Sequence, residues 1–176
     1  MRQRQNLDLL LTGFWLGEAQ VGLGFHLIYS QGAGVVYYFA LLAVWLFGSI
    51  LGMRLINSAR TAFFVQIFSA LAFPTAALMS RSMPFTILSL LSILTAVLAI
   101  SSYAGWFLKS RIAVYNDVSR VLLYENNGFI LGYAFAGMLL FFSISKIDFS
   151  TLFLLVFSII FELVCPLKYP ITASEK

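Results

Sequence analysis

Six long apolar segments constrain the fold of this chain more than any other feature. They cover residues 7–30, 35–56, 61–80, 84–108, 128–145 and 149–165. A helix needs about 20 mostly apolar residues, within a range of about 17–25, to cross the hydrocarbon core of a bilayer. Each segment falls in that range. We therefore predict an all-α integral membrane protein, a six-transmembrane-helix bundle that forms a single domain over residues 1–176.

The composition excludes a soluble globular domain. Hydrophobic residues make up 61% of the chain and charged residues 10%, whereas an average soluble domain has about 45–50% apolar and about 25% charged residues. The single cysteine, Cys165, excludes an internal disulfide and a thiolate metal cluster. Residues 7–30 are expected to be an uncleaved first span, because no small-residue cleavage site follows a short apolar core.

Basic residues are divided unequally between the two sides of the predicted bundle. Six spans place both termini on one side, together with nine Lys and Arg residues: Arg2, Arg4, Arg54, Arg60, Lys109, Arg111, Arg120, Lys168 and Lys176. The other side has only Arg81 and Lys146. Since cytoplasmic loops are enriched in Lys and Arg, we predict cytoplasmic termini. The same single basic residues argue against a nucleic-acid partner.

The longest connection, residues 109–127, mixes charged residues with regularly placed apolar ones. This mixture is typical of an amphipathic helix that lies on the lipid headgroups. We predict such a cytoplasmic helix between the fourth and fifth spans.

The first segment contains the main candidates for a functional site. Glu18 lies near its middle, Gln20 follows two residues later, and His26, the only histidine of the chain, lies two turns further on. Gln66 of the third segment lies near the depth of Glu18. A carboxyl in hydrocarbon is costly and usually marks a function.

Three interpretations of Glu18 stay open. It forms a structural hydrogen bond, with Gln20, Gln66, Ser69 or Ser92 as partner. It lies in a proton or cation transport path. Or it contacts a cofactor, a lipid or a partner subunit.

His26 lies near the outer end of the first segment. A lone histidine can ligate one (bacterio)chlorophyll magnesium or one axial position of a haem, but not both axial positions. The alternative is an interfacial histidine bonded to a carbonyl or a lipid headgroup. No other metal ligand set is predicted, and lipid is the one bound molecule that we expect.

Small residues recur four positions apart on three segments. They are Gly13 and Gly17, Gly48 and Gly52, and Gly128 and Gly132, with Ala136 one turn further on. This spacing makes a flat stripe on which another helix backbone can approach closely. It predicts tight packing among the first, second and fifth spans.

Three of these stretches resemble a known family. The first span has Gly13-Phe14-Trp15-Leu16-Gly17-Glu18, the second ends in Trp45-Leu46-Phe47-Gly48-Ser49-Ile50-Leu51-Gly52-Met53-Arg54, and the fifth begins near Leu123-Tyr124-Glu125-Asn126-Asn127-Gly128-Phe129-Ile130-Leu131-Gly132. Together they resemble the integral membrane region of bacterial spermidine-synthase-like proteins, which looks like half of a major facilitator transporter. The resemblance implies a helix-packing face around Glu18 and a place in the bacterial inner (plasma) membrane.

The chain also departs from that family. The synthase chemistry of such proteins belongs to a soluble domain, and these 176 residues contain none. Gly17 replaces the tyrosine before the family's glutamate, and the acidic residue of the transporter half is missing from Gly52-Met53-Arg54-Leu55. The resemblance therefore implies the fold and not the aminopropyl-transfer activity.

The sequence favours a non-enzymatic function. No Walker, HExxH or GxSxG motif and no metal-spaced carboxylate cluster occurs. We predict a subunit or scaffold that packs against other integral membrane subunits or against itself. The first alternative is a small half-transporter that works as a dimer with Glu18 in the substrate or proton path. It ranks second because transport sites usually contain several ionisable groups, and Glu18 is the only carboxyl at clear mid-membrane depth. The second alternative is a pigment- or haem-associated subunit that uses His26.

Overall fold

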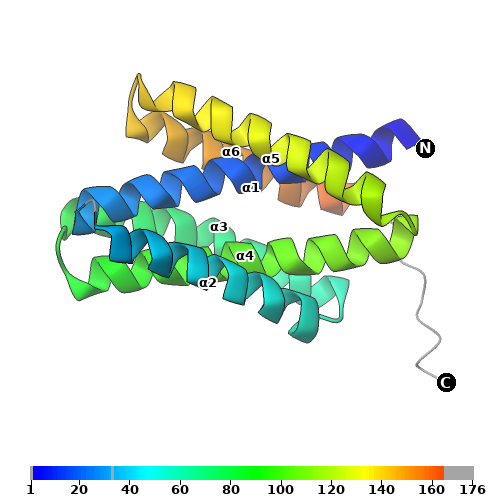
Figure 1. The fold of residues 1–176 in the computed structure, drawn as a ribbon, viewed down its shortest axis with the longest axis horizontal. Coiled ribbons are helices and arrows are strands. Elements are labelled where there is room, and N and C mark those ends of the chain that lie inside the picture. The colour runs from blue at the N-terminus through cyan, green and yellow to red at the C-terminus, as the bar shows by residue number, and fades with distance from the viewer. Residues whose placement is uncertain (1, 33, 165–176) are drawn as a thin grey trace.

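The computed structural model describes residues 2–32 and 34–164, with the side chains of residues 2, 3 and 162–164 excepted. The described chain forms six helices that lie side by side and run alternately in opposite directions (Figure 1). They are α1 (Arg2–Gln31), α2 (Val35–Leu55), α3 (Ala59–Ser82), α4 (Ile87–Tyr115), α5 (Val118–Leu140) and α6 (Ile144–Val164). No strand occurs in this part of the chain. The prediction of an all-α bundle is confirmed.

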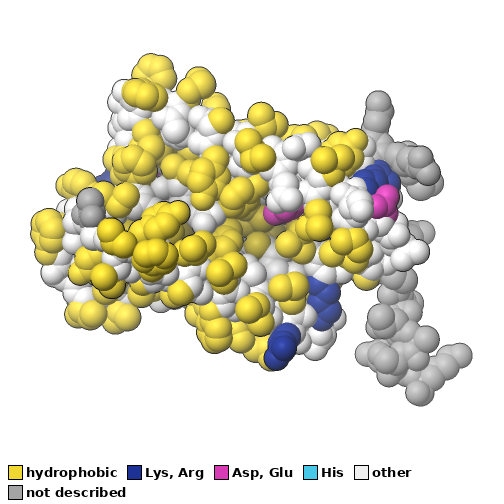
Figure 2. Space-filling model, in the orientation of Figure 1, with side chains coloured by type: hydrophobic (Ala, Val, Ile, Leu, Met, Phe, Trp, Pro, Cys, Tyr) yellow, Lys and Arg dark blue, Asp and Glu magenta, His cyan; other side chains and the backbone are white. Residues whose placement is uncertain are grey.

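Four of the six helices are long and apolar enough to cross a bilayer. They are α2, α3, α4 and the Ile144–Phe161 part of α6. Hydrophobic side chains cover most of the face that Figure 2 shows, and most of its Lys and Arg side chains gather toward the end where α1 begins. The chain is thus membrane-embedded by length and composition. That α1 and α5, which contain more polar residues, also span the membrane stays a prediction.

The prediction of a separate surface helix at residues 109–127 is wrong. α4 continues into this segment, α5 begins within it, and a two-residue turn joins the two helices. Asn116 ends α4 in the left-handed conformation (φ 49°), which asparagine tolerates better than most residues. The Asp117 carboxylate then caps α5 by accepting a hydrogen bond from the backbone N–H of Arg120 at 2.9 Å. The mixed composition of the segment therefore belongs to the ends of two long helices.

The glycines of α1 and α5 bring these two helices together. Gly13 and Gly17 of α1 lie against backbone carbonyls of α5, while Gly128 and Gly132 of α5 lie against backbone carbonyls of α1. A Cβ at any of the four would overlap the carbonyl oxygen that faces it. The predicted close approach of the first and fifth spans is confirmed, and Ala136 is fully buried one turn further along α5.

The glycines of α2 pack against a different helix from the one predicted. Gly52 lies against the carbonyl of Ser102 on α4, Gly48 lies against Ser101 of the same helix, and Gly105 of α4 lies against the carbonyl of Ser49. The prediction that the second span packs with the first and fifth is therefore wrong, since its close partner is α4. A stripe of small residues predicts a close approach, but it does not identify the helix that approaches.

The two close helix pairs resemble each other. Residues 48–52 of α2 and 128–132 of α5 share the pattern Gly-X-Ile-Leu-Gly. If α1, α2 and α3 are matched in order with α4, α5 and α6, the α1–α5 contact corresponds to the α4–α2 contact. The two close pairs are thus built in the same way, whereas α3 and α6 are not equivalent: among the described residues α3 contacts both α1 and α4, and α6 contacts α1 but not α4.

We expect the glycines in contact to be far less replaceable than those that are not. Gly132→Ala places a methyl group on the Phe14 carbonyl and should lower the free energy of unfolding by about 1–3 kcal/mol, as overpacking does. Gly137→Ala on the same helix meets no atom within 4 Å and should raise it by about 0.5–1 kcal/mol, because alanine favours a helix over glycine. Unfolding in mixed micelles measures both, and equal effects would contradict the packing described here.

Candidate functional site

Buried polar side chains of α1, α3 and α6 follow one interior seam of the bundle, where these three helices contact one another. We call them the polar line; they are Asp8, Thr12, Trp15, Glu18 and His26 of α1, Gln66 and Ser80 of α3, and Asp148, Thr151 and Ser158 of α6. Asp148 and Ser158 are half-buried, and the others are at most 5% exposed. Burying polar groups away from water costs free energy. A seam of this kind therefore indicates that these side chains have a function that outweighs the cost.

The α1 members of the polar line occupy one side of that helix. Asp8, Thr12, Trp15 and Glu18 are three or four residues apart, and His26 returns to the same side after two more turns. At a rise of about 1.5 Å per residue, the helix covers about 27 Å between Asp8 and His26. The hydrocarbon core of a bilayer is about 30 Å thick. The polar line is thus long enough to connect one side of a membrane with the other.

At the end where α1 finishes, His26 is held between α3 and α6. Its Nε2 lies 2.7 Å from Asp148 Oδ1, and its Nδ1 lies 2.7 Å from the Ser80 hydroxyl. Asp148 also forms an ion pair with Arg81. A cavity of about 300 Å³ beside the cluster is lined by His26, Tyr29, Arg81, Ile144 and Ser145. His26 is fully buried and bonded to side chains, so it is not the interfacial histidine that the sequence suggested.

The Ser80 hydroxyl accommodates both protonation forms of His26. Its oxygen lies 2.7 Å from His26 Nδ1 and 2.8 Å from the carbonyl oxygen of Ala77. When Nδ1 carries no proton, the hydroxyl donates to it. When Nδ1 is protonated, the hydroxyl accepts that N–H and donates to Ala77. In both forms Nε2–H donates to Asp148, so His26 can gain or lose a proton without leaving a buried group unpaired.

The same contacts argue against His26 as a metal ligand. A histidine coordinates a metal through a free ring-nitrogen lone pair, and both ring nitrogens of His26 already face side-chain partners. Ligation of a (bacterio)chlorophyll magnesium or a haem iron would have to break one of these bonds. Within the residues that the structure describes, no group of three or more His, Cys, Asp or Glu side chains could hold a metal ion.

At the opposite end of the line, Asp8 forms a buried ion pair with α4. Arg111 Nε donates to Asp8 Oδ2 at 2.7 Å, and Arg111 Nη2 lies 3.4 Å from Oδ1. The Arg111 side chain is 1% exposed, and its guanidinium lies 4.6 Å from the ring centroid of Phe107. The Tyr115 hydroxyl also reaches Asp8, at 3.4 Å. Asp8 is thus the charged group that ties the first turns of α1 to the last turns of α4.

Glu18 lies between these two ends. It is fully buried, and neither carboxyl oxygen has a hydrogen-bond partner among the described residues. The Ser150 hydroxyl of α6 interacts with this carboxyl but does not form a hydrogen bond of good geometry with it. More than nine in ten buried polar groups in proteins are hydrogen-bonded, so an exception needs an explanation.

The partners proposed for Glu18 from the sequence are engaged elsewhere. Gln66 donates through Nε2 to the Ser158 hydroxyl at 3.0 Å. Ser69 donates to the carbonyl of its own helix four residues back, and Ser92 to the carbonyl three residues back. Gln20, only half-buried, lines a cleft away from the polar line. The structural hydrogen bond predicted for Glu18 with these residues is therefore not formed.

Glu18 is not the only buried carboxyl among the described residues. Asp8 is 5% exposed and Glu125 of α5 is 7% exposed. Asp8 lies near the start of the first predicted span, residues 7–30. Glu125 was assigned to the connection at residues 109–127 and belongs to α5. The described residues thus contain more buried carboxyls than the sequence suggested, and Glu18 is the one nearest the middle of its helix.

An apolar plug interrupts the polar line between Glu18 and His26. Gly22 lies one turn from each of them on α1, and a Cβ there would meet Ile147 of α6 at 3.1 Å and the Phe73 ring at 3.4 Å. Phe73 and Ile147 are both fully buried. Pro74 follows Phe73 inside α3, and a proline within a helix removes one backbone hydrogen bond and favours bending there. In this structure the plug separates Glu18 from the His26 cluster.

Gln20 belongs to a second cavity on the other side of α1. This cavity, of about 210 Å³, lies where α1 and α2 diverge and is lined by Gln20, Val21, Gly24, Phe25, Leu27, Ile28, Gly34, Tyr37, Tyr38, Leu41, Leu42 and Tyr133. No atom lies within 4 Å of a Cβ built at Gly24, so the absence of a side chain there leaves part of the space open. Gln20 and Glu18, two residues apart, therefore serve different sites.

Sequence reasoning singled out Glu18, His26 and Gln66 and missed most of the residues around them. The missed members are Asp8, Thr12, Ser80, Arg81, Arg111, Asp148, Thr151 and Ser158. A partial signal was present on α1, where Asp8, Thr12, Trp15 and Glu18 recur every three or four positions, whereas the polar residues of α3 and α6 are spaced more widely. What the sequence could not supply is that these three stripes face one another.

No protein-family model, no curated protein and no solved structure matches this chain.

Proposed function

We propose that this chain is a small, non-enzymatic membrane transport protein that moves protons along the polar line, alone or coupled to another solute. The observation that carries the proposal is Glu18, a fully buried carboxyl without a hydrogen-bond partner between two ionic clusters. A carboxyl that served only to clamp helices would be bonded to one of them. Chains of Asp, Glu and His side chains are the groups that relay protons in pumps and transporters.

The number of ionisable groups in the line supports transport over the subunit function that the sequence favoured. Asp8, His26 and Asp148 accompany Glu18 on one seam. Each can bind or release a proton, and the Ser80 hydroxyl supports both forms of His26. The scaffold prediction rested in part on a shortage of buried ionisable groups, and the described residues contain more of them than the sequence suggested.

The apolar plug supports a cycle of alternate exposure. In this conformation Glu18 lies on the Asp8 side of Phe73 and Ile147, while His26 lies beyond them. Glu18 takes up a proton from the Asp8 side. Bending of α3 at Pro74 moves Phe73 aside, and the proton passes to the His26 cluster. When the Phe73 ring returns to its place, it closes the path again. A continuous proton leak is thereby prevented, as gated transport requires.

The distribution of basic residues supports an orientation. Of the described Lys and Arg side chains, those at the Asp8 end are Arg4, Arg54, Arg60, Lys109, Arg111 and Arg120. Only Arg81 and Lys146 lie at the His26 end. By the positive-inside rule the Asp8 end faces the cytoplasm. The resemblance to spermidine-synthase-like membrane regions and to half of a major facilitator transporter adds the bacterial inner membrane as the location and pairing of two copies as the working form.

Glu18→Gln tests the proposal. Purified protein in proteoliposomes with an imposed pH difference is expected to dissipate the difference faster than protein-free vesicles, and Glu18→Gln should return the rate to the protein-free value, because an amide cannot carry the proton. Glu125→Gln is the matched control, since it neutralises a buried carboxyl outside the polar line, and it should keep the wild-type rate. Wild-type flux that survives Glu18→Gln would overturn the proposal.

A second candidate is the subunit or scaffold function. The observation that favours it is α2, which buries only Leu41, Gly48 and Gly52 and borders the open cavity at Gln20. A partner helix could cover both. Mild extraction followed by mass spectrometry tests this candidate. A stoichiometric membrane partner that a Gly24→Leu variant no longer retains would favour it, and a lone chain would remove it.

A further inference from the structure

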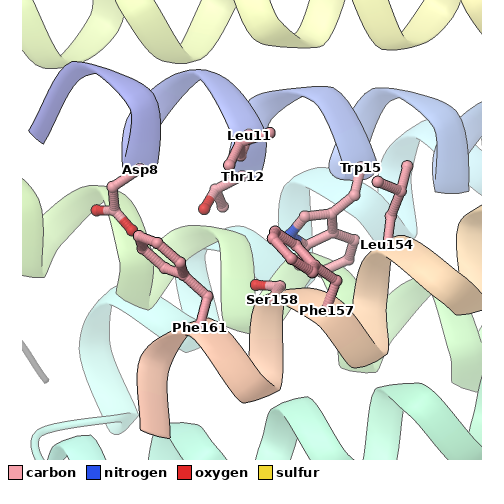
Figure 3. Close-up of a pocket in the computed structure, with 8 residues that line it drawn as sticks. All are labelled: Asp8, Leu11, Thr12, Trp15, Leu154, Phe157, Ser158 and Phe161. Atoms are coloured by element: carbon pink, nitrogen blue, oxygen red, sulfur yellow. The ribbon is translucent and has the colours of Figure 1, made fainter. Parts of the chain in front are cut away.

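A small cavity lies between α1 and α6 on the Asp8 side of Glu18. Its volume is about 20 Å³. Figure 3 shows the residues that line it, which are Asp8, Leu11, Thr12, Trp15, Leu154, Phe157, Ser158 and Phe161. On this measure a single water molecule needs about 10–15 Å³. The cavity therefore has room for one water molecule and for no organic ligand.

Polar groups with unused hydrogen-bonding capacity line this cavity. Trp15 is 1% exposed, and its indole N–H has no partner among the described residues. In Figure 3 the Trp15 indole nitrogen and the hydroxyls of Thr12 and Ser158 border the same space between α1 and α6. The Ser158 oxygen already accepts from Gln66 at 3.0 Å, so its own hydrogen remains to be donated.

The arrangement of donors and acceptors fits water better than an ion. The Trp15 N–H and the Ser158 O–H both need an acceptor, which excludes a metal cation at their meeting point. The Asp8 carboxylate at the edge of the cavity disfavours an anion. A water oxygen can accept from Trp15 and Ser158 and donate to Thr12 and Asp8, which gives it the two to four polar partners that buried water usually has.

We propose that one water molecule binds in this cavity and is the middle step of the proton path between Asp8 and Glu18. Along α1 these two residues are separated by about 15 Å, too far for a direct hydrogen bond. When a proton arrives from the Asp8 side, the water gives up the hydrogen bond from Ser158, takes the proton on the freed lone pair and releases a different proton to the Thr12 hydroxyl. Thr12 passes its own hydroxyl proton on toward Glu18, so the water and the hydroxyl are both regenerated and no other reactant is consumed. Its role in transport rests on the proposed function, whereas its binding does not.

Nuclear magnetic resonance of the Trp15 indole N–H tests the binding directly. In micelles we expect a cross-peak between this N–H and a bound water, with the signal assigned by its loss in Trp15→Phe. Thr12→Val, which keeps the side-chain shape, and Ser158→Ala should each weaken or abolish that cross-peak. An indole N–H that shows no contact with water in the wild-type protein would overturn the inference.

Proton flux in proteoliposomes tests the role of the water. Thr12→Val and Ser158→Ala should each lower the flux at least about tenfold, the smaller end of what losing one proton-transfer group costs. Thr75→Val is the control, because Thr75 bonds its own helix at an exposed site, and it should keep the wild-type flux. Unchanged flux in both cavity variants would overturn the role.

The two measurements separate this inference from the proposed function. A hydrated Trp15 in a protein without any proton flux would contradict the transport function and leave the water site standing. A dry Trp15 in a protein with Glu18-dependent flux would contradict the water site alone.

Discussion

Phe73→Ala is expected to turn the protein into a proton leak. The Phe73 ring and Ile147 fill the space beside Gly22 that separates Glu18 from the His26 cluster. Removing the ring opens the space between the Glu18 and His26 regions, and the polar groups of these two regions supply the hydrogen-bond partners that water needs to enter it. Proteoliposomes with Phe73→Ala should therefore lose an imposed pH difference at least about tenfold faster than those with the wild-type protein, since one transfer step no longer waits for a conformational change.

A matched pair of variants separates the leak from general loosening of the core. Ile147→Ala opens the plug from the α6 side and should also leak. Ile93→Ala removes the same atoms from a fully buried site on α4 that is not part of the plug. Each should cost about 2–5 kcal/mol of stability. A leak of equal size in Ile93→Ala would mean that the plug has no special role.

Asp8→Ala is expected to cause one of the largest losses of stability among single substitutions. It leaves the 1% exposed Arg111 guanidinium without its carboxylate partner. Breaking a buried ion pair by removing one member costs about 3–5 kcal/mol, because the remaining charge is buried and uncompensated. Unfolding in mixed micelles should show this loss, together with easier separation of α1 from α4.

The double variant Asp8→Leu with Arg111→Met is the control for that prediction. Replacing a buried pair by apolar residues of similar size is often neutral or stabilising, so the double variant should recover most of the stability. It should still lack proton flux, because the Asp8 end of the polar line is lost. Asp8→Ala with wild-type stability would contradict the structural role given to this pair.

Much of the fold could be predicted from the sequence because the bilayer restricts it so strongly. Each spanning helix needs an apolar run of defined length, and glycines four residues apart mark close helix contacts. The predicted contact between the first and fifth spans formed at Gly13 and Gly132. The partner of Gly48 could not be predicted, because a small-residue stripe fits any backbone, and the arrangement of α2 beside α4 depends on the whole bundle.

The site was harder to predict for a related physical reason. Glu18 and His26 stand out, since polar residues in apolar runs are rare. Asp148 and Ser80, which hold His26, lie 122 and 54 residues away in the sequence and resemble ordinary residues near helix ends. Their role depends on which helix faces which. Asp8 lies within the first predicted span, but nothing in the sequence shows that Arg111, 103 residues away, lies beside it.

Proton flux through the Phe73→Ala, Glu18→Gln double variant tests the central claim most directly. The claim is that Glu18 and the plug lie on one path. If they do, the leak that Phe73→Ala opens must pass through Glu18, and the double variant should be as tight as protein-free vesicles. A leak in the double variant equal to that of Phe73→Ala alone would show that protons bypass Glu18, and would contradict the account.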